Sequence, residues 1–384
     1  MSEVLLPGAR IGILGGGQLG RMLALAARRL GYRTLVLDPD PGGPAAQVAD
    51  GCLAAALDDA DAVRELARAC DVLTLEWENA DAAALREVEA TAPVRPGPHV
   101  LEVAQHRLRE KDAARRLGLP TAEYRPVRNR AELDAALAAL GCPAVLKTCQ
   151  GGYDGRGQVV IQHPAGAGAA LAALGGEGAD LILEAWVRFR LEASVVVARS
   201  VSGEIACFPV GENTHRGGIL ESTQVPARLP APVAREAQRI GEALAEGLQV
   251  VGLLAVELFV EEDGGLRVNE IAPRPHNSGH YTWEACVVSQ FEQHLRAVCG
   301  LPLGSPELLR PAAMVNLLGE HLGAGGAAPC WAGAFADPTV ALHLYGKREA
   351  RVGRKMGHLT ALADSAEQAL ARALDARRRL GGAA

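Results

Sequence analysis

Two glutamates, Glu257 and Glu270, lie at equal distances from a turn centred on Asp263 and Gly264. Apolar, β-branched segments flank this turn, and Asp-Gly between such segments predicts a β-hairpin because the turn needs backbone angles that glycine tolerates. In that hairpin the glutamates are cross-strand partners on one face, where their like charges repel. A divalent cation removes the repulsion, and carboxylate oxygens suit Mg²⁺. The hairpin therefore predicts a magnesium site; the alternative is two solvated glutamates on a surface hairpin.

A polar segment, 274–280, follows the hairpin and reads Arg-Pro-His-Asn-Ser-Gly-His. Proline stiffens it, and its side chains are rich in hydrogen-bond donors. We therefore expect an anion-binding loop directly beside the predicted metal site.

A glycine-rich segment, 151–158, lies between strands predicted at 144–147 and 159–162. A Walker loop would need a helix after its Gly-Lys-Ser/Thr, so this segment is a different kind of loop. Its backbone N–H groups suit phosphate oxygens, and Lys147 and Arg156 add positive charge. The segment predicts a phosphate-binding flap; the alternative is an ordinary glycine hairpin.

A second glycine loop, 15–20, follows a strand predicted at 10–14 and precedes a helix predicted at 21–30. With a further strand at 34–37 and Asp38 after it, the loop forms the G-x-G-x-x-G pattern of a β-α-β nucleotide-binding unit. The pattern is typical of nicotinamide enzymes, although the same loop binds other anions at a helix N-terminus.

Glu76 directly follows a buried strand predicted at 72–75. In an open parallel sheet, the carboxyl edge of the strands is where ligands bind. We therefore expect Glu76 at a ligand site, and the alternative is that it caps the end of the strand.

The densest positive patch of the chain is the segment 345–358, which joins strands predicted at 340–344 and 359–362. It carries glycine at both bends, and its arginines suit bidentate phosphate recognition. The segment predicts a phosphate clamp, whereas a solvated turn is the alternative.

The remaining periodic patterns complete the expected architecture. Helices are predicted at 107–117, 130–140, 164–178, 233–246, 283–299 and 365–380, strands at 181–187, 191–199, 204–210 and 313–317, and a polar loop at 213–222. The helix at 233–246 should pack under the glutamate hairpin. A proline-rich break at 93–98 and a shift of composition near 305 indicate three domains, 1–105, 106–304 with a flap lobe at about 118–183, and 305–384.

Composition excludes several classes of function. The 384 residues are 49% hydrophobic with a formal net charge of −6, which disfavours nucleic-acid binding because that depends on neutralising phosphates. Eight scattered cysteines, without a Cys-x-x-Cys pair, are interpreted as buried small residues in a reducing cytoplasm. Neither a signal peptide nor an apolar stretch of about 18 residues is evident, so no membrane partner is expected.

Three motifs together resemble the N5-carboxyaminoimidazole ribonucleotide synthetase family over nearly the whole length. They are Lys147 with the flap G-G-Y-D-G-R-G-Q, the hairpin end N-E-I-A-P-R-P-H-N-S-G-H-Y-T, and the tail Y-G-K to R-K-M-G-H. The resemblance implies a mixed α/β and α+β fold, with a doubly wound, Rossmann-like N-terminal domain, a two-lobed ATP-grasp domain and a small β-rich C-terminal domain. It also implies a cytoplasmic homodimer that carboxylates aminoimidazole ribonucleotide with bicarbonate and ATP, through carboxyphosphate, in purine biosynthesis.

The resemblance also implies site residues. ATP would be bound by Arg107, Lys147, Gly152, Tyr153, Asp154, Gly155, Arg156, Gly157, Gln158, Glu184, Ala185, Trp186, Val187, Glu192, His215, Asn269 and Glu270, with Glu257 and Glu270 on Mg²⁺. The ribonucleotide would be bound by Gly17, Gln18, Glu76, Tyr153, Asp154, Arg274, His276, Lys347, Arg351 and Arg354. Among these, Lys147 would balance charge, Arg274 would hold bicarbonate, and Asp154 would orient the substrate amine or accept its proton.

Other functions remain to be weighed against this one. A biotin carboxylase would carry Asn at the position of Ala272, which argues against that enzyme. A formate-dependent glycinamide ribonucleotide formyltransferase shares a similar P-R-P-H segment, but the flap sequence and His280-Tyr281 favour the carboxylase. A nicotinamide dehydrogenase would leave the paired glutamates unexplained, and a non-catalytic nucleotide-binding module would not need the basic tail.

Overall fold

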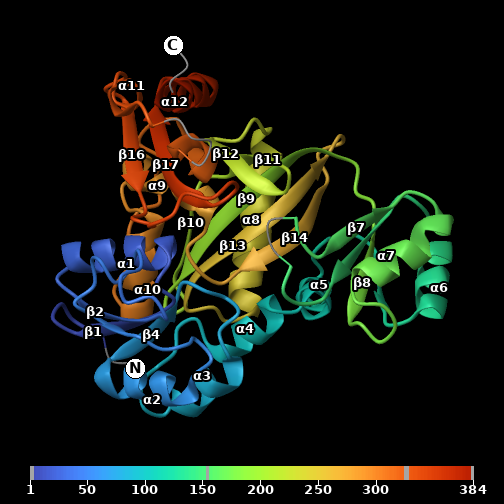
Figure 1. The fold of residues 1–384 in the computed structure, drawn as a ribbon, viewed down its shortest axis with the longest axis horizontal. Helices are drawn as coiled ribbons and strands as arrows, with labels where there is room; N and C mark the ends of the chain where they lie inside the picture. Colours follow the sequence, from blue (N-terminus) through green and yellow to red (C-terminus); the bar gives the residue numbers. More distant parts are fainter. Residues whose placement is uncertain (1–3, 153–154, 324–327, 382–384) are drawn as a thin grey trace.

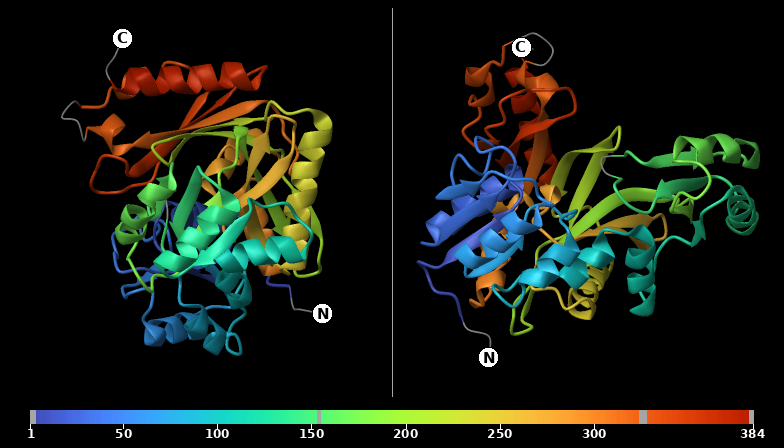
Figure 2. Two further views of the ribbon diagram at one scale, coloured as in Figure 1. Left: turned by 90° about the vertical axis from the view of Figure 1, so that its right-hand side faces the viewer. Right: turned by 60° about the horizontal axis from the view of Figure 1, so that its bottom comes forward.

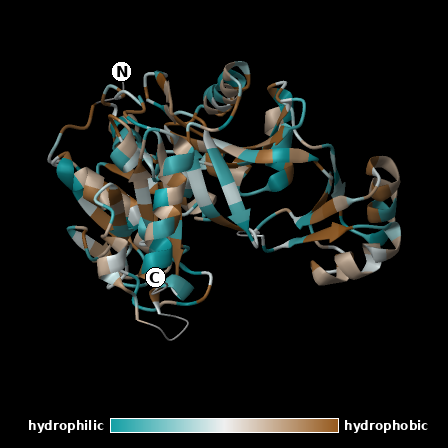
Figure 3. Ribbon diagram, turned by 90° about the horizontal axis from the view of Figure 1, so that it is seen from above, coloured by the Kyte–Doolittle hydropathy of each residue, from teal (hydrophilic) through white to brown (hydrophobic). Residues whose placement is uncertain are grey.

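A computed structural model describes residues 4–152, 155–323 and 328–381 of the chain. Within these ranges the strands form three sheets, a parallel sheet near the N-terminus, a large central sheet and a small sheet in a lobe that projects to one side (Figures 1 and 2). Most elements mix apolar and polar residues, as Figure 3 shows, which is typical of elements with one buried and one exposed face.

The N-terminal sheet has the order β3-β2-β1-β4, and all its strands are parallel. Its elements are β1 (Arg10–Leu14), α1 (Gln18–Arg29), β2 (Arg33–Leu37), β3 (Gly51–Leu53), α2 (Ala60–Ala69), β4 (Val72–Leu75), α3 (Ala82–Val88) and α4 (Pro98–Ala104). One face packs on α1 and on α10 (Gln290–Cys299), and the other packs on α2 and α3. The predicted doubly wound unit is confirmed, and the strands are buried on both faces as expected for a parallel sheet.

The small sheet has the order β5-β8-β6-β7 and belongs to the projecting lobe (Figure 2). Helix α5 (Arg107–Arg116) leads into this lobe, which comprises β5 (Tyr124–Val127), α6 (Arg130–Leu140), β6 (Ala144–Thr148), β7 (Gln158–Ile161), η1 (Pro164–Gly166), α7 (Ala167–Ala173) and β8 (Leu181–Ala185). Helices α6 and α7 bury one face of the sheet through Leu133, Leu137 and Leu171. The other face of the small sheet is not covered by these two helices.

The large sheet has the strand order β14-β13-β9-β11-β12-β15-β17-β16, with β10 paired to β9. Its strands are β9 (Phe189–Arg199), β10 (Ile205–Cys207), β11 (Gly211–Arg216), β12 (Ile219–Val225), β13 (Gly252–Glu261), β14 (Leu266–Ala272), β15 (Ala312–Leu318), β16 (Val340–Leu344) and β17 (Lys355–Leu362). Associated helices are α8 (Ala231–Gly247), η2 (Asn277–Gly279), α9 (Thr282–Ala285), η3 (Gly319–Leu322), α11 (Trp331–Ala334) and α12 (Ala366–Leu380). The C-terminal strands therefore extend the central sheet, and α8 packs under the β13–β14 hairpin as predicted.

The predicted polar loop at 213–222 is wrong, because this segment forms the hairpin of β11 and β12. Its polar side chains bond within the sheet: Thr223 Oγ1 donates to Asn213 Oδ1 at 2.9 Å. Partners of this kind allow polar residues to occupy buried strand positions that hydropathy alone assigns to a loop.

The predicted single helix at 283–299 is also wrong. Helix α9 ends after one turn, and α10 begins anew after Ser289, whose hydroxyl accepts the N–H of Glu292 at 3.2 Å. A serine N-cap favours the start of a new helix, because its hydroxyl accepts a first-turn backbone N–H that has no partner within that helix.

The expectation that the cysteines are buried holds for only part of the set. Cys142 and Cys330 are exposed, whereas four others are buried and two are partly buried. Both exposed cysteines lie next to a proline or tryptophan at the edge of an element, where a small side chain is not enclosed. In the described part of the chain, no helix is long and apolar enough to cross a bilayer.

His294 joins the parallel sheet to the central sheet. Its Nδ1 accepts the N–H of Leu253 at 3.1 Å, and its Nε2 lies 2.6 Å from Thr74 Oγ1. Because the ring is buried and Nδ1 must remain an acceptor, the pKa of His294 falls from 6.5 to about 3.

Acid should therefore destabilise the fold through His294. The folded state keeps the ring neutral. The contribution of His294 to the free energy of unfolding is therefore complete above pH 6.5 and is lost as the pH falls toward 3. Between pH 7.5 and pH 5 we expect the wild type to lose about 2 kcal/mol more stability than a His294→Gln variant. Urea unfolding at both pH values measures this difference, and parallel losses in the two proteins would contradict the assignment.

Candidate active site

The β13–β14 hairpin places Glu257 opposite Glu270, as predicted, but by a different route. Gly264 N–H donates to Glu261 O at 3.0 Å and Glu261 N–H donates to Gly265 O at 2.8 Å, so the loop holds three residues rather than two. The predicted turn centre, between Asp263 and Gly264, is therefore wrong by half a residue, because the loop is centred on Asp263.

A β-bulge restores the predicted pairing. Near the turn Leu258 faces Val268, whereas one step further Glu257 faces Glu270, so Asn269 is the extra residue. A continuous ladder would instead pair Glu257 with Asn269 and turn Glu270 to the other face of the sheet. The bulge is thus what brings the two carboxylates together.

The glutamate pair brings two carboxylates together, and the side chain of Glu257 is largely buried. Burial, together with the neighbouring charge of Glu270, raises the pKa of Glu257 to about 8. The side-chain oxygen of Asn269 is also buried, and it has no hydrogen-bond partner among the described residues. Buried oxygens in this state are favourable ligands for a cation.

Two histidines approach the same pair from neighbouring segments. His276 Nε2 lies 3.4 Å from Glu257 Oε1, and His215 Nδ1 lies 2.7 Å from Glu192 Oε2. Burial opposes the charged form of His215, but the hydrogen bond to Glu192 and the charge of Glu257 raise its pKa above the ordinary value. The structure therefore brings the predicted residues of β9, β11 and the 274–280 segment to the hairpin.

The small lobe contributes a buried ion network. Lys147 Nζ donates to Glu184 Oε2 at 2.8 Å, and Lys111 Nζ lies 3.6 Å from Glu184 Oε1. Burial opposes ionisation of Glu184, but the two lysines prevail and lower its pKa to about 2. Arg107 Nη1 in turn donates to Glu270 Oε2 at 3.2 Å. The network therefore links the small lobe to the glutamate hairpin.

The flap segment returns from the end of β6 to the start of β7. Thr148 N–H donates to Gly157 O at 2.9 Å, and Gly157 has a φ of +71°. A Cβ on Gly157 would lie 2.7 Å from Thr148 Oγ1, so only glycine fits this closure. A Cβ on Gly152 would lie 3.0 Å from Arg156 O and 3.4 Å from Arg107 Nη2. Among the predicted flap residues, Tyr153 and Asp154 lie outside the described residues.

The predicted adenine-binding segment lies at the end of β8. Ala185 is the last residue of the strand, and Trp186 and Val187 lie beyond it. The side chain of Glu184 is committed to the two lysines, so the nearby apolar surface comes from Trp186, which is 44% exposed. The predicted strand at 181–187 is therefore shorter than expected.

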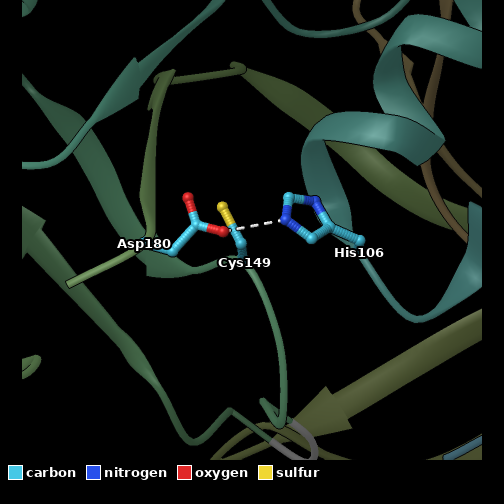
Figure 4. A group of neighbouring side chains, drawn as sticks. All are labelled: His106, Cys149 and Asp180. Carbon is cyan, nitrogen blue, oxygen red and sulfur yellow. Dashed lines mark hydrogen bonds and ion pairs between the residues drawn. The ribbon is translucent and has the colours of Figure 1, made fainter.

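A histidine, a cysteine and an aspartate meet where the small lobe joins the body (Figure 4). His106 Nε2 lies 2.9 Å from Asp180 Oδ2, with the Cys149 thiol beside them. Burial and the charge of Asp180 raise the pKa of Cys149 to about 12, so it packs as a neutral thiol. The three side chains link the start of α5 to the end of β6 and the start of β8, next to the flap.

The N-terminal glycine loop binds carboxylates of its own chain. Glu76 accepts the N–H groups of Gly17 at 2.7 Å and Gly20 at 2.9 Å, and Asp38 accepts the N–H of Gly16 at 2.7 Å. These are the amides that would bind the pyrophosphate of a dinucleotide. The nicotinamide interpretation is therefore unsupported, and Glu76 orders the loop that precedes Gln18, the first residue of α1.

Arg274 extends from the hairpin end toward this loop. Its Nε donates to Glu78 Oε2 and its Nη1 donates to Pro275 O at 3.1 Å. Burial opposes ionisation of Glu78, but the arginine outweighs it and lowers the pKa of Glu78. The charge of Arg274 also acts on Glu76. Sequence reasoning missed Glu78, although its place after a buried parallel strand was a signal.

The basic tail and the N-terminal domain enclose a cavity of about 270 Å³. It is lined by Asp40, Gly42, Gly43, Pro44, Gly346, Lys347, Arg348, Glu349, Arg351 and Arg354. Gln47 Nε2 donates to Gly346 O at 2.8 Å, and Ala45 N–H donates to Gly16 O at 2.9 Å, so the cavity wall is joined to the glycine loop. Sequence reasoning missed the 40–44 wall, for which Pro-Gly-Gly after a parallel strand was the available signal.

The fold and this site define an ATP-grasp enzyme. Residues 112–291 match the ATP-grasp domain family, residues 9–105 the ribonucleotide synthetase preATP-grasp domain, and residues 312–372 the phosphoribosylaminoimidazole carboxylase C-terminal domain. The N5-carboxyaminoimidazole ribonucleotide synthase of Bacillus subtilis is 47% identical over 362 residues, covering 93% of this chain and 92% of that protein. The chain belongs to the N5-carboxyaminoimidazole ribonucleotide synthase family.

Solved structures agree with this membership. An ADP complex of N5-carboxyaminoimidazole ribonucleotide synthetase is 48% identical, with a TM-score of 0.92 and 98% of each chain covered. An Aspergillus clavatus enzyme in complex with ADP and 5-aminoimidazole ribonucleotide is 34% identical, with a TM-score of 0.88 and 97% and 99% of the chains covered. The fold class expected from the sequence is confirmed.

Proposed function

We propose that this chain uses ATP to carboxylate the exocyclic amine of 5-aminoimidazole ribonucleotide with bicarbonate, releasing ADP and phosphate. The observation that carries the proposal is one continuous arrangement of charged groups. Lys111 joins the Lys147–Glu184 pair to β14 of the glutamate hairpin, and Arg274, just after the hairpin, binds Glu78 of the N-terminal domain, which also forms one wall of the basic cavity. A triphosphate and a phosphorylated substrate would thus have separate binding places.

Mg²⁺ fits the glutamate pair. Glu257 and Glu270 would hold it, since the two carboxylates pair across the hairpin and burial together with the charge of Glu270 raises the pKa of Glu257. When bound, the ion would offset the charge of the phosphoryl group in transfer.

The first step is attack of a bicarbonate oxygen on the terminal phosphorus of ATP, with ADP as leaving group. Such transfers depend on positioning and charge neutralisation more than on covalent chemistry. Lys147 would contact the phosphates, because Glu184 fixes its ammonium group at the end of β6. Arg107, held by Glu270, would add a second positive charge on the same side.

The second step is attack of the substrate amine on the carbonyl carbon of carboxyphosphate, with phosphate as leaving group. Carboxyphosphate reacts with water, so the flap at 151–158 would exclude solvent. Arg274, anchored by Glu78, would hold the bicarbonate-derived oxygens. Asp154 would orient the amine or accept the proton that it loses.

The cavity formed by the tail would bind the 5′-phosphate of the ribonucleotide through Lys347, Arg351 and Arg354. Replacement of Arg354 by alanine should therefore raise the KM for the ribonucleotide about 10- to 100-fold and spare the KM for ATP, since a charged hydrogen bond contributes about 1.5–3 kcal/mol. Steady-state kinetics with each substrate varied in turn measure both constants. A rise confined to ATP would refute the clamp.

One assay tests the proposed reaction. ADP formation is measured with ATP and bicarbonate, with and without aminoimidazole ribonucleotide, and then with formate and glycinamide ribonucleotide. We expect fast ADP formation only with bicarbonate and aminoimidazole ribonucleotide together. Activity with formate and glycinamide ribonucleotide instead would identify the formyltransferase reaction and overturn the proposal.

We further propose a cytoplasmic homodimer and retain the three domain limits set out from the sequence. Exposed apolar side chains support a protein contact: Val287 is 50% exposed and Leu309 is 63% exposed. The two segments are neighbours, because Leu309 N–H donates to Ala285 O at 2.7 Å. Light scattering distinguishes a dimer from a monomer.

A further inference from the structure

Two consecutive charged residues, Glu110 and Lys111, are buried in α5 with exposed fractions of 3% and 1%. Ionisable side chains are almost never this buried unless they are paired, because desolvation costs several kcal/mol for each ion. They lie one helical turn after Arg107 in α5, which packs against β14, and their side chains contact that strand. The steps proposed above use neither residue.

Lys111 binds the backbone of the β14 bulge. Its Nζ donates to Val268 O at 3.1 Å and to Asn269 O at 2.8 Å. Asn269 is the extra residue of the bulge, where the regular ladder of the hairpin is interrupted. Lys111 thus supplies two hydrogen bonds to successive carbonyl groups immediately before Glu270.

Glu110 binds the same strand on the other side of Glu270. Its Oε1 accepts the backbone N–H of Ile271. The two side chains of α5 therefore hold the residues before and after Glu270 by their main-chain atoms. Because these contacts are to main-chain atoms of β14, they fix the register of the strand and so the direction in which Glu270 points.

The register matters because the two glutamates meet only through the bulge. Loss of the bulge would shift the pairing by one residue and turn Glu270 to the opposite face of the sheet. Lys111 also approaches Glu184 Oε1 at 3.6 Å, and Glu184 holds Lys147. One buried ammonium group thus connects the strand of Glu270 with the lysine of the small lobe.

We propose that Glu110 and Lys111 are positioning residues, which fix the β14 bulge and so keep Glu270 beside Glu257 for cation binding and phosphoryl transfer. The inference rests on the proposed function for its kinetic consequence and on the hairpin geometry alone for its structural one. Both residues contact the main chain of β14 directly, and Lys111 also contacts Glu184.

The test compares Lys111→Met with Arg116→Met, which alters an exposed residue of the same helix. We expect Lys111→Met to raise the Mg²⁺ concentration for half-maximal rate about 10- to 100-fold and to lower kcat by a similar factor, as replacement of outer partners of metal ligands does. The KM for the ribonucleotide should stay within about twofold, because no residue of α5 lines the basic cavity. Arg116→Met should behave as the wild type.

A matched pair at the neighbouring position keeps the test decisive if Lys111→Met does not fold. Glu110→Gln retains an oxygen that accepts the Ile271 N–H, whereas Glu110→Met does not. We expect Glu110→Met to require more Mg²⁺ and Glu110→Gln to recover most of the loss. Equal behaviour of the two variants would overturn the positioning role.

A second measurement does not depend on turnover. Hydrogen exchange of the Ile271 and Glu270 amides in the free protein should accelerate at least tenfold in Glu110→Met and remain slow in Glu110→Gln and Arg116→Met. Unchanged exchange in Glu110→Met would refute the clamp even if activity fell. If the wild type formed no ADP with aminoimidazole ribonucleotide, the proposed function would fail, while the exchange experiment would still decide whether the clamp exists.

Discussion

Replacement of Glu270 by glutamine should lower turnover about 1,000-fold, the upper range for loss of one charged group at a transferring centre. Glutamine keeps the size of the side chain but removes the charge that a cation and Arg107 share. The fold should survive, because the change also removes repulsion from Glu257, whose pKa should then fall from about 8 toward its ordinary value. ADP release in the presence of bicarbonate and ribonucleotide measures the effect.

A control for this variant lies on the same hairpin. Glu262 is exposed in the turn, so Glu262→Gln removes an equal charge without touching the site. We expect its kcat and melting temperature to match the wild type. Near-normal ADP release from Glu270→Gln, with the control equally active, would remove the metal assignment from this hairpin.

Replacement of Glu184 by glutamine should destabilise the fold by about 3–5 kcal/mol, as loss of one partner of a buried ion pair does. Glu184 is 3% exposed and is shared by Lys147 and Lys111, so the variant removes the carboxylate that two buried ammonium groups share. Urea unfolding at pH 7.5 measures the loss. A surface pair provides the control: Glu236→Gln, opposite Arg239 on α8, should cost less than about 0.5 kcal/mol.

The pH dependence of this effect has a definite sign. The lysines lower the pKa of Glu184 from 4.5 to about 2, so its stabilisation is complete above pH 4.5 and disappears as the pH falls toward 2. Over that interval, the free energy of unfolding of the wild type should fall by about 3 kcal/mol more than that of Glu184→Gln. Removing one orphaned ammonium group in the Lys147→Met, Glu184→Gln double variant should restore part of the stability. Additive losses in that double variant would show that the side chains are not coupled.

The glutamate hairpin shows how a correct prediction can depend on two deviations that cancel. The pairing of Glu257 with Glu270 was expected from a two-residue turn, yet the loop has three residues and a bulge at Asn269 compensates. Turn composition indicates a hairpin reliably, but it does not specify loop length. The bulge is held by Lys111, which is far away in the sequence, so hairpin composition alone contains no signal for it.

The glycine loop at 15–20 illustrates the opposite outcome. Its spacing is that of a dinucleotide-binding loop, and local sequence gives no reason to reject that interpretation. The structure places the carboxylates of Glu76 and Asp38 on the loop amides, so the anion at this helix N-terminus belongs to the protein itself. Which anion a glycine loop binds depends on residues brought to it by the sheet.

The sequence by itself determined β1, α1, β2 and β4 of the N-terminal unit, the hairpin with its paired glutamates, and the chemistry expected of the flap and tail. These features depend on local periodicity, glycine and charge, which act over a few residues. Only the tertiary structure decided that Glu78 anchors Arg274, that the 40–44 loop closes the basic cavity, and that Glu110 and Lys111 hold the bulge. Each of these contacts joins segments distant in the chain, and packing selects such partners after the local elements have formed.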